Sequence, residues 1–260
     1  MSDHILVSRA DGVCEVQLNR PDKRNALTLA MYGALIDALN EARADESIRV
    51  VLLSGAGVSF TAGNDLNDFL SQGVPGGDSA DSSANFSDSS NAVRFLETLR
   101  GFRKVLVAAV HGQTVGIGVT TLLHCDLVVA ARSTQMSMPF VKLGLVPEAG
   151  SSLLLPRLVG YQRAAELLLL GRPFDAAEAL QMGLVNRVTE DASLMDEARR
   201  LARTIAQQPP GALLAAKRLL RSETGLGARM QEELEAFRVQ LGSEEFKAAV
   251  QAFFAKARGA

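Results

Sequence analysis

Three continuous apolar runs constrain the fold of this chain more than any other feature. They are RVVLLSG (49–55), KVLVAAV (104–110) and DLVVAA (126–131). A short uninterrupted apolar run is typical of a strand buried on both faces of a sheet. Alternating runs at 5–10 and 13–19 precede them, followed by a helical pattern that begins after Thr28, its expected N-cap. This order of strands and helices predicts an α/β fold.

After Ala149 the sequence is almost entirely helical in pattern, with successive amphipathic runs that end at glycine or proline. We therefore expect a core unit over 1–200 and a helical region that supplies oligomer contacts over 201–260. The Ser-, Gly- and Asp-rich segment 71–91 has too little apolar content to fold alone, which predicts a mobile surface loop. Such a loop is either a lid beside a site or a simple insertion.

Charge and composition narrow the classes of function. The formal net charge is −2 and 47% of residues are hydrophobic, so the chain offers no general basic surface for nucleic acid or an anionic membrane. No run approaches the ~18 apolar residues of a membrane span, and we expect a soluble, cytoplasmic protein. Cys14 and Cys125 lie in apolar runs and are interpreted as reduced core residues.

Several familiar catalytic motifs are missing from the sequence. Its histidines, His4, His111 and His124, are too dispersed for zinc-ligand spacing. No G-x-S-x-G nucleophile elbow occurs, which disfavours a serine triad. The glycine turns GAGVSF (55–60) and GIGVTTLL (116–123) both lack the third glycine of a dinucleotide site, and no P-loop is present.

One arrangement occurs twice: an apolar strand, a glycine turn and the start of a helix, at 50–70 and again at 105–123. The first N–H groups of a helix have no intrahelical partner, and the helix dipole is positive at that end. Two such ends that meet at one point would hold a developing oxyanion. The alternative is that both are only tight turns in a covered sheet.

Five motifs in order resemble the crotonase, or enoyl-CoA hydratase/isomerase, superfamily. They are LNRPDKRNAL (18–27), FTAGNDL (60–66), the stretch 104–131, MPFVKLGLVPEAGSSLLLPRLVG (138–160) and ALQMGLVNRV (179–188). The resemblance implies a ClpP-like spiral of ββα units with a helical C-terminal trimerisation region. It also implies acyl-CoA thioester substrates, no cofactor apart from the CoA of the substrate, and a homotrimer or dimer of trimers.

The same resemblance assigns the binding residues. It places the backbone N–H groups that hold the thioester oxygen at Asn64 and Ile117. It implies that Gly63, Gly116 and Gly118 let the chain approach the ligand without a Cβ clash. The remaining expected substrate- or CoA-binding residues are Lys23, Arg24, Ala62, Asp65, Leu66, Phe140, Phe254 and Lys256, the last two reaching a neighbouring subunit's CoA. Lys23 and Arg24 have an equal alternative as solvated loop residues, and Asp65 as a helix cap.

Glu148 is the expected catalytic residue. It falls where peroxisomal-type Δ3,Δ2-enoyl-CoA isomerases, which this chain resembles, carry a single catalytic carboxylate. Typical hydratases carry two glutamates, and Thr120 and Phe140 occupy those positions here. Moving a double bond needs only one base, which takes a proton from C2 and returns it to C4. Burial among apolar neighbours would raise the pKa of Glu148 and make it a stronger base.

Three alternatives stay open at the level of sequence. One is an enoyl-CoA hydratase that uses Glu148 alone. Another is a different crotonase reaction, such as ring-opening isomerisation or thioester hydrolysis, with Asp65 or Asp68 assisting. The last is a relative that binds acyl-CoA or RNA without catalysis; RNA binding would require a basic stripe, which the scattered Lys and Arg do not form.

Overall fold

The computed structural model describes residues 3–67, 90–221 and 224–258. Its larger sheet has six strands in the order β1-β2-β3-β4-β6-β9. These strands are β1 (Ile5–Ala10), β2 (Val13–Leu18), β3 (Val50–Gly55), β4 (Val105–Val110), β6 (Leu127–Ala131) and β9 (Arg187–Thr189). β1 and β2 form an antiparallel hairpin across Asp11 and Gly12, which both have positive φ, and the other pairs are parallel.

A smaller sheet repeats the winding of the larger one. It contains β5 (Gln113–Val115), β7 (Gln135–Ser137) and β8 (Phe174–Asp175) in that order. β4 leads directly into β5, and β6 leads into β7, so each turn of chain contributes one strand to each sheet. Thr61, beyond the end of β3, forms a parallel bridge with Thr114 of β5 and adds a third turn to the pattern. The expected spiral of ββα units is confirmed.

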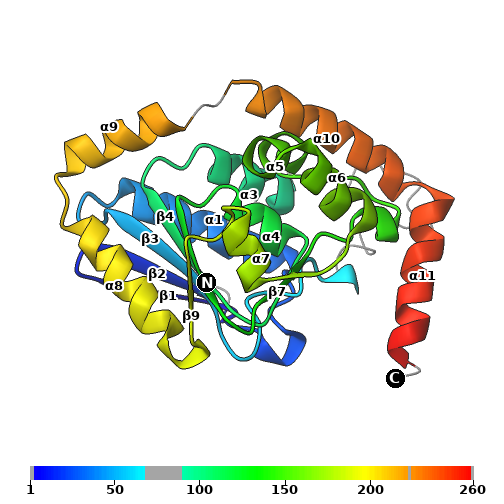
Figure 1. Cartoon of the computed structure of the whole chain (residues 1–260), viewed down its shortest axis with the longest axis horizontal. Helices are drawn as coiled ribbons and strands as arrows, with labels where there is room; N and C mark the ends of the chain where they lie inside the picture. The colour runs from blue at the N-terminus through cyan, green and yellow to red at the C-terminus, as the bar shows by residue number, and fades with distance from the viewer. Residues whose placement is uncertain (1–2, 68–89, 222–223, 259–260) are drawn as a thin grey trace.

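Helices cover both faces of the larger sheet (Figure 1). The helices of the described residues are α1 (Leu29–Ala44), α3 (Asn91–Arg100), α4 (Ile117–Leu122), α5 (Ser151–Val159), α6 (Tyr161–Leu170), α7 (Ala176–Gln181), α8 (Leu194–Ala206), α9 (Pro210–Leu220), α10 (Leu226–Leu241) and α11 (Glu244–Arg258). Short 3₁₀ turns are η1 (Pro21–Lys23), η2 (Val141–Leu143) and η3 (Asp191–Ser193). α9, α10 and α11 run along the outer edge of the molecule in Figure 1. α8 runs through residue 200, and the division of the chain there stays a prediction.

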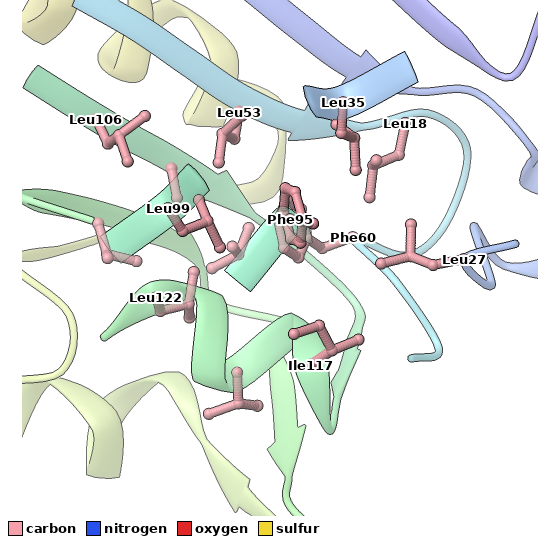
Figure 2. Close-up of a cluster of buried hydrophobic side chains, with 14 of the residues drawn as sticks. Leu18, Leu27, Leu35, Leu53, Phe60, Phe95, Leu99, Leu106, Ile117 and Leu122 are labelled. Atoms are coloured by element: carbon pink, nitrogen blue, oxygen red, sulfur yellow. The ribbon is translucent and has the colours of Figure 1, made fainter. Parts of the chain in front are cut away.

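Alternate residues of each buried strand enter two different apolar layers. Val50 and Leu52 of β3 pack with one face of α8, whereas Val51 and Leu53 belong to the main core with α1, α3 and α4. Figure 2 shows part of that main core, in which Leu53 lies among side chains from several elements. Burial on both faces is the reason that these strands are continuously apolar rather than alternating.

The expected strands and helices are confirmed, with two corrections. Thr28 caps α1, and its hydroxyl accepts the N–H of Met31. The prediction that the chain is almost all helix after Ala149 is wrong at β8 and β9, because two- and three-residue strands give no readable periodicity. The predicted loop 71–91 lies outside the described residues except for its last two positions. Cys14 and Cys125 carry free thiols.

Within the described residues, no helix is both long enough and apolar enough to cross a membrane. The same part of the chain contains no group of three His, Cys, Asp or Glu side chains that could hold a metal ion.

Candidate active site

Strand pairing brings the two glycine turns together. The N–H of Thr61 donates to the carbonyl of Gln113 at 3.2 Å, and the N–H of Val115 donates to the carbonyl of Thr61 at 3.0 Å. Because Thr61 and Thr114 are paired in parallel, the residues that follow them leave the sheet at the same edge. Asn64 and Ile117 each lie three residues beyond a paired threonine, and both line one recess.

The backbone N–H groups of Asn64 and Ile117 donate no hydrogen bond to any residue that the structure describes. Leu27 instead pairs with the peptides on either side of Asn64, through its N–H to Gly63 and its carbonyl to Asp65. Ile117 is the first residue of α4, where the N–H has no intrahelical acceptor. Its side chain is buried in the main core (Figure 2). Both N–H groups therefore have no acceptor within the described part of the chain, and their binding of a ligand oxygen stays a prediction.

The glycines of these turns are required by the fold of the chain itself, and their role toward a ligand stays a prediction. Gly63 has φ of 93° and Gly116 has φ of 56°, a backbone region that residues other than glycine rarely adopt. Gly118 is a packing residue, because a Cβ there would lie 2.5 Å from the methyl group of Thr61. The atoms that a Cβ at Gly63 would meet are those of Val115, so close approach between segments of the protein itself requires glycine.

Glu148 lies in the loop before α5, and its side chain lines the same recess as Asn64 and Ile117. Burial raises the pKa of Glu148 to about 8, a hydrogen bond from Thr120 acts in the opposite direction, and the charge of Glu233 adds to the increase. The Thr120 hydroxyl donates to Glu148 Oε1 at 2.5 Å. Thr120 therefore orients the carboxylate of Glu148.

The backbone after Glu148 is held in an unusual conformation. Ala149 has φ of 61°, a left-handed conformation that costs a non-glycine residue about 1–2 kcal/mol. The carbonyl of Ala149 accepts a hydrogen bond from His124 Nε2 at 2.7 Å, and His124 Nδ1 then accepts one from Arg221 at 3.0 Å. Burial lowers the pKa of His124 to about 4, so this imidazole is neutral at physiological pH. His124 is thus a structural residue, not a proton donor or acceptor for a ligand.

The recess has a cavity volume of about 40 Å³ and is partly open to solvent. Its wall is mainly apolar, with a few polar groups near Glu148. The lining residues are Tyr32, Asn64, Ala92, Val93, Leu96, Glu97, Ile117, Glu148, Ala149, Met230, Gln231, Glu233, Leu234 and Phe237. The Tyr32 hydroxyl donates to Asn64 Oδ1, and the pKa of Tyr32 lies well above its ordinary value because of burial and the nearby charge of Glu148.

One face of α10 forms part of this wall, which the sequence analysis missed. Met230, Glu233, Leu234 and Phe237 are spaced three, four and seven residues from the first, so they share a helix face. The apolar residues of this face agree with the amphipathic helices that the sequence predicts in the C-terminal region. The signal that could have indicated a site is Glu233, a carboxylate on an otherwise apolar stripe.

Most of the predicted CoA-binding residues are not among those that line the recess. Lys23 and Arg24 are exposed in the loop before α1, and Arg24 donates to the Gln113 side chain at 3.1 Å. The N–H of Ala62 donates to the carbonyl of Arg24. The carboxylate of Asp65 pairs with Arg20 at 2.6 Å and accepts the N–H of Asn67 at 3.0 Å. The N–H that Asp65 accepts from Asn67 fits its alternative as a helix cap, and its contact with a substrate stays a prediction.

The other predicted binding residues lie around the edges of the site. Phe140 is buried, with its ring 4.0 Å from the position of a Cβ at Gly116. Leu66 is half-buried near the end of the described segment 3–67. Phe254 is half-buried in α11 and packs edge-on against Phe253, with ring centroids 5.8 Å apart. Lys256 also belongs to α11, but its side chain is outside the description.

The site combines two backbone N–H groups without a described acceptor, the Glu148 carboxylate with its raised pKa, and a mainly apolar wall. The family model for enoyl-CoA hydratase/isomerase matches residues 8–259. The chain therefore belongs to the enoyl-CoA hydratase/isomerase family, and it is an enzyme of that acyl-CoA-processing family.

Relatives within the family carry different activities in their names. The chain is 36% identical to 1,2-epoxyphenylacetyl-CoA isomerase of Escherichia coli, over 98% of this chain and 97% of that protein. It is also 36% identical to enoyl-CoA delta isomerase 2 of Rattus norvegicus, over 97% of this chain and 63% of that longer protein. The 2,3-dehydroadipyl-CoA hydratase of Escherichia coli is 34% identical over 97% of this chain and 96% of its own length.

Solved structures agree with the fold. The enoyl-CoA hydratase/isomerase of Pseudoalteromonas atlantica superposes with a TM-score of 0.89 at 41% identity, covering 98% of both chains. The Pseudomonas aeruginosa protein OdaA superposes with a TM-score of 0.90 at 43% identity, covering 97% of this chain and 99% of its own.

Proposed function

We propose that this protein is a Δ3,Δ2-enoyl-CoA isomerase. The observation that carries the proposal is that Glu148, a buried carboxylate held by one side-chain donor, lines the same recess as Asn64 and Ile117, whose N–H groups have no acceptor among the described residues. A pKa of about 8 places the base close to physiological pH, where a general base is most effective.

The reaction proceeds in two proton transfers. Glu148 takes a proton from C2 of the 3-enoyl thioester, and the C2–H electron pair forms a C1–C2 double bond as the thioester oxygen becomes negative. The N–H groups of Asn64 and Ile117 stabilise that oxygen; removal of one such donor typically costs about 3–4 kcal/mol of transition-state stabilisation. The dienolate then takes the same proton from Glu148 at C4, which leaves the double bond between C2 and C3 and regenerates the carboxylate.

A hydratase is the second candidate, because relatives of similar identity include one. Water addition needs one group to activate water and another to manage the α-carbon proton. The positions that carry those glutamates in typical hydratases hold Thr120 and Phe140. Glu233 lines the recess, but both of its oxygens accept backbone N–H groups, which favours a reaction with one base.

We further propose that the enzyme needs no cofactor and works as a trimer or dimer of trimers. Leu219 and Leu220 at the end of α9 are 80% and 87% exposed, and Phe253 of α11 is 49% exposed, which supports contacts between copies through the C-terminal helices. Lys23, Arg24, Phe254 and Lys256 remain proposed CoA contacts, the last two across subunits. The cytoplasmic location stays a prediction.

The test mixes the purified protein with a trans-3-enoyl-CoA and follows the ultraviolet absorbance of the conjugated 2-enoyl thioester. We expect absorbance to rise, and Glu148→Gln to reduce the rate by about 10²–10⁴-fold, the usual contribution of a general base. Loss of signal from added 2-enoyl-CoA through hydration, without isomerisation, would favour the hydratase. If CoA esters bind but neither reacts, the protein is a binder or acts on a different acyl group.

A further inference from the structure

The N-terminus of α5 is capped by a residue from a distant helix. Its own N-cap residue is Gly150, which has no side chain to accept the exposed N–H groups of the first turn. Glu233 of α10 supplies both acceptors: its Oε2 accepts the N–H of Gly150 at 2.6 Å and its Oε1 accepts the N–H of Ser152 at 2.9 Å. The Glu233 residue is only 6% exposed. A carboxylate also suits the positive end of the helix dipole.

This cap holds the backbone immediately beyond the proposed base. Gly150 is two residues after Glu148, with the left-handed Ala149 between them. Strained conformations of this kind persist only where the surrounding structure fixes them, and they occur frequently at functional sites. His124 holds the carbonyl of Ala149 from the side of α4, and Glu233 holds the next N–H from the side of α10. The turn is fixed from both directions.

We propose that Glu233 is a positioning residue of this site: from α10 it fixes the turn that carries Glu148, and it places a second negative charge on the wall of the same recess. The proposal rests on the proposed role of Glu148 as the base. Glu233 is not itself a catalytic residue, because both of its oxygens are engaged by backbone donors.

The charges that surround Glu148 come from several helices. Tyr32 of α1 is protonated at neutral pH, since its pKa is raised, and Glu97 of α3 is paired with Arg100 at 2.8 Å. His124, two residues beyond the end of α4, is neutral. Glu233 takes part in none of the ion pairs of the described residues, although the charge of Arg229 on the same helix lowers its pKa, and the charge of Glu233 contributes to the raised pKa of Glu148.

Glu233 and Glu148 are distinguished by their donors. Burial raises the pKa of Glu233 as well, but the N–H groups of Ser152 and Gly150 oppose this effect. Glu148 has one donor, the Thr120 hydroxyl. The carboxylate with two N–H donors at a helix N-terminus retains its charge more readily, so the proton is held on Glu148.

The decisive experiment needs no substrate. The titration of Glu148 is followed by NMR of protein labelled with ¹³C at the glutamate side-chain carboxyl, with Glu148→Gln used to assign its signal. We expect Glu233→Gln, which removes the charge, to move the Glu148 titration to lower pH. Glu235→Gln is the matched control, because Glu235 is an exposed glutamate of the same helix, and it should leave the titration unchanged.

Kinetics with trans-3-enoyl-CoA provide the second readout. We expect Glu233→Ala to lower kcat by about 10²-fold, the cost of a misplaced catalytic group, while KM changes little. Glu233→Gln should show a smaller loss and an acidic limb of the kcat/KM profile at lower pH. If Glu233→Ala does not fold, Glu233→Gln, which keeps one acceptor oxygen, decides the question.

The two hypotheses fail in different ways. An unchanged Glu148 titration in Glu233→Gln, or a change in KM alone, overturns the role of Glu233. If the wild-type protein does not isomerise 3-enoyl-CoA, the proposed reaction fails, and the NMR titration still tests whether Glu233 acts on Glu148.

Discussion

Replacing Glu148 by glutamine should stabilise the protein at high pH while it removes activity. Glu148 has a pKa of about 8 in the folded protein against 4.5 for an ordinary glutamate. The folded state therefore binds this proton more tightly than the unfolded state. Stability is fully present below about pH 4.5 and is lost as the pH rises to about 8, because ionisation costs more in the folded protein. Glutamine does not ionise, so the variant does not lose folding stability in this way.

The size of the effect follows from the interval between the two pKa values. At about 1.4 kcal/mol per pH unit, an interval of roughly 3.5 units sets an upper limit of about 5 kcal/mol. Glu148 keeps partial access to solvent through the recess, and the glutamine amide gains two donors that need acceptors. We therefore expect a net stabilisation of about 2–3 kcal/mol at pH 9 and almost none at pH 5.

Urea unfolding at fixed protein concentration, at pH 5, 7 and 9, measures this difference between wild type and Glu148→Gln. Glu235→Gln serves as a control for loss of an exposed carboxylate on a helix. A stability difference that does not vary with pH would refute the reasoning, as would a Glu148→Gln protein less stable than wild type at pH 9. The first result would mean that Glu148 ionises as easily in the folded protein as in the unfolded chain, and the second that the unmet donors of the glutamine amide cost more than the ionisation of Glu148.

Two further substitutions test the surroundings of the site. Thr120→Val removes the hydroxyl that donates to Glu148. Because a hydrogen bond to a charged group contributes about 1.5–3 kcal/mol, the acidic limb of the kcat/KM profile should move upward by about 1–2 pH units. The control variant Thr120→Ser keeps a hydroxyl and should leave the limb in place. An unmoved limb in the valine variant would contradict this. Gly118→Ala places a Cβ 2.5 Å from the Thr61 methyl and should destabilise the protein by about 1–3 kcal/mol in urea unfolding; wild-type stability would show that the turn accommodates the methyl group.

The strand and helix assignments near the site were accessible from sequence because their signals are local. A continuous apolar run such as 104–110 is determined by burial on both faces, and Thr28 marks the beginning of α1 by its capping hydroxyl. The short strands β8 and β9 were missed because two or three residues cannot display a period. Their pairing depends on partners supplied by β7 and β6.

The roles of individual polar residues were harder to predict from the sequence than the strands and helices. Asp65 was predicted both as a substrate contact and as a cap, and its spacing could not reveal Arg20 as its partner. His124 gave no indication that it would support the turn after Glu148. In both cases the partner lies on another element, so no local pattern carries the information.

The sequence by itself determined the two glycine turns, the apolar strands that precede them and the single carboxylate at 148, because backbone conformation and burial impose residue types at fixed local spacing. Tertiary structure decided what those parts do together. The parallel pairing of Thr61 with Thr114 sets the two free N–H groups at one recess, and α10 returns Glu233 to a turn 83 residues earlier in the chain. Contacts between distant segments depend on three-dimensional packing, which leaves no period in the sequence.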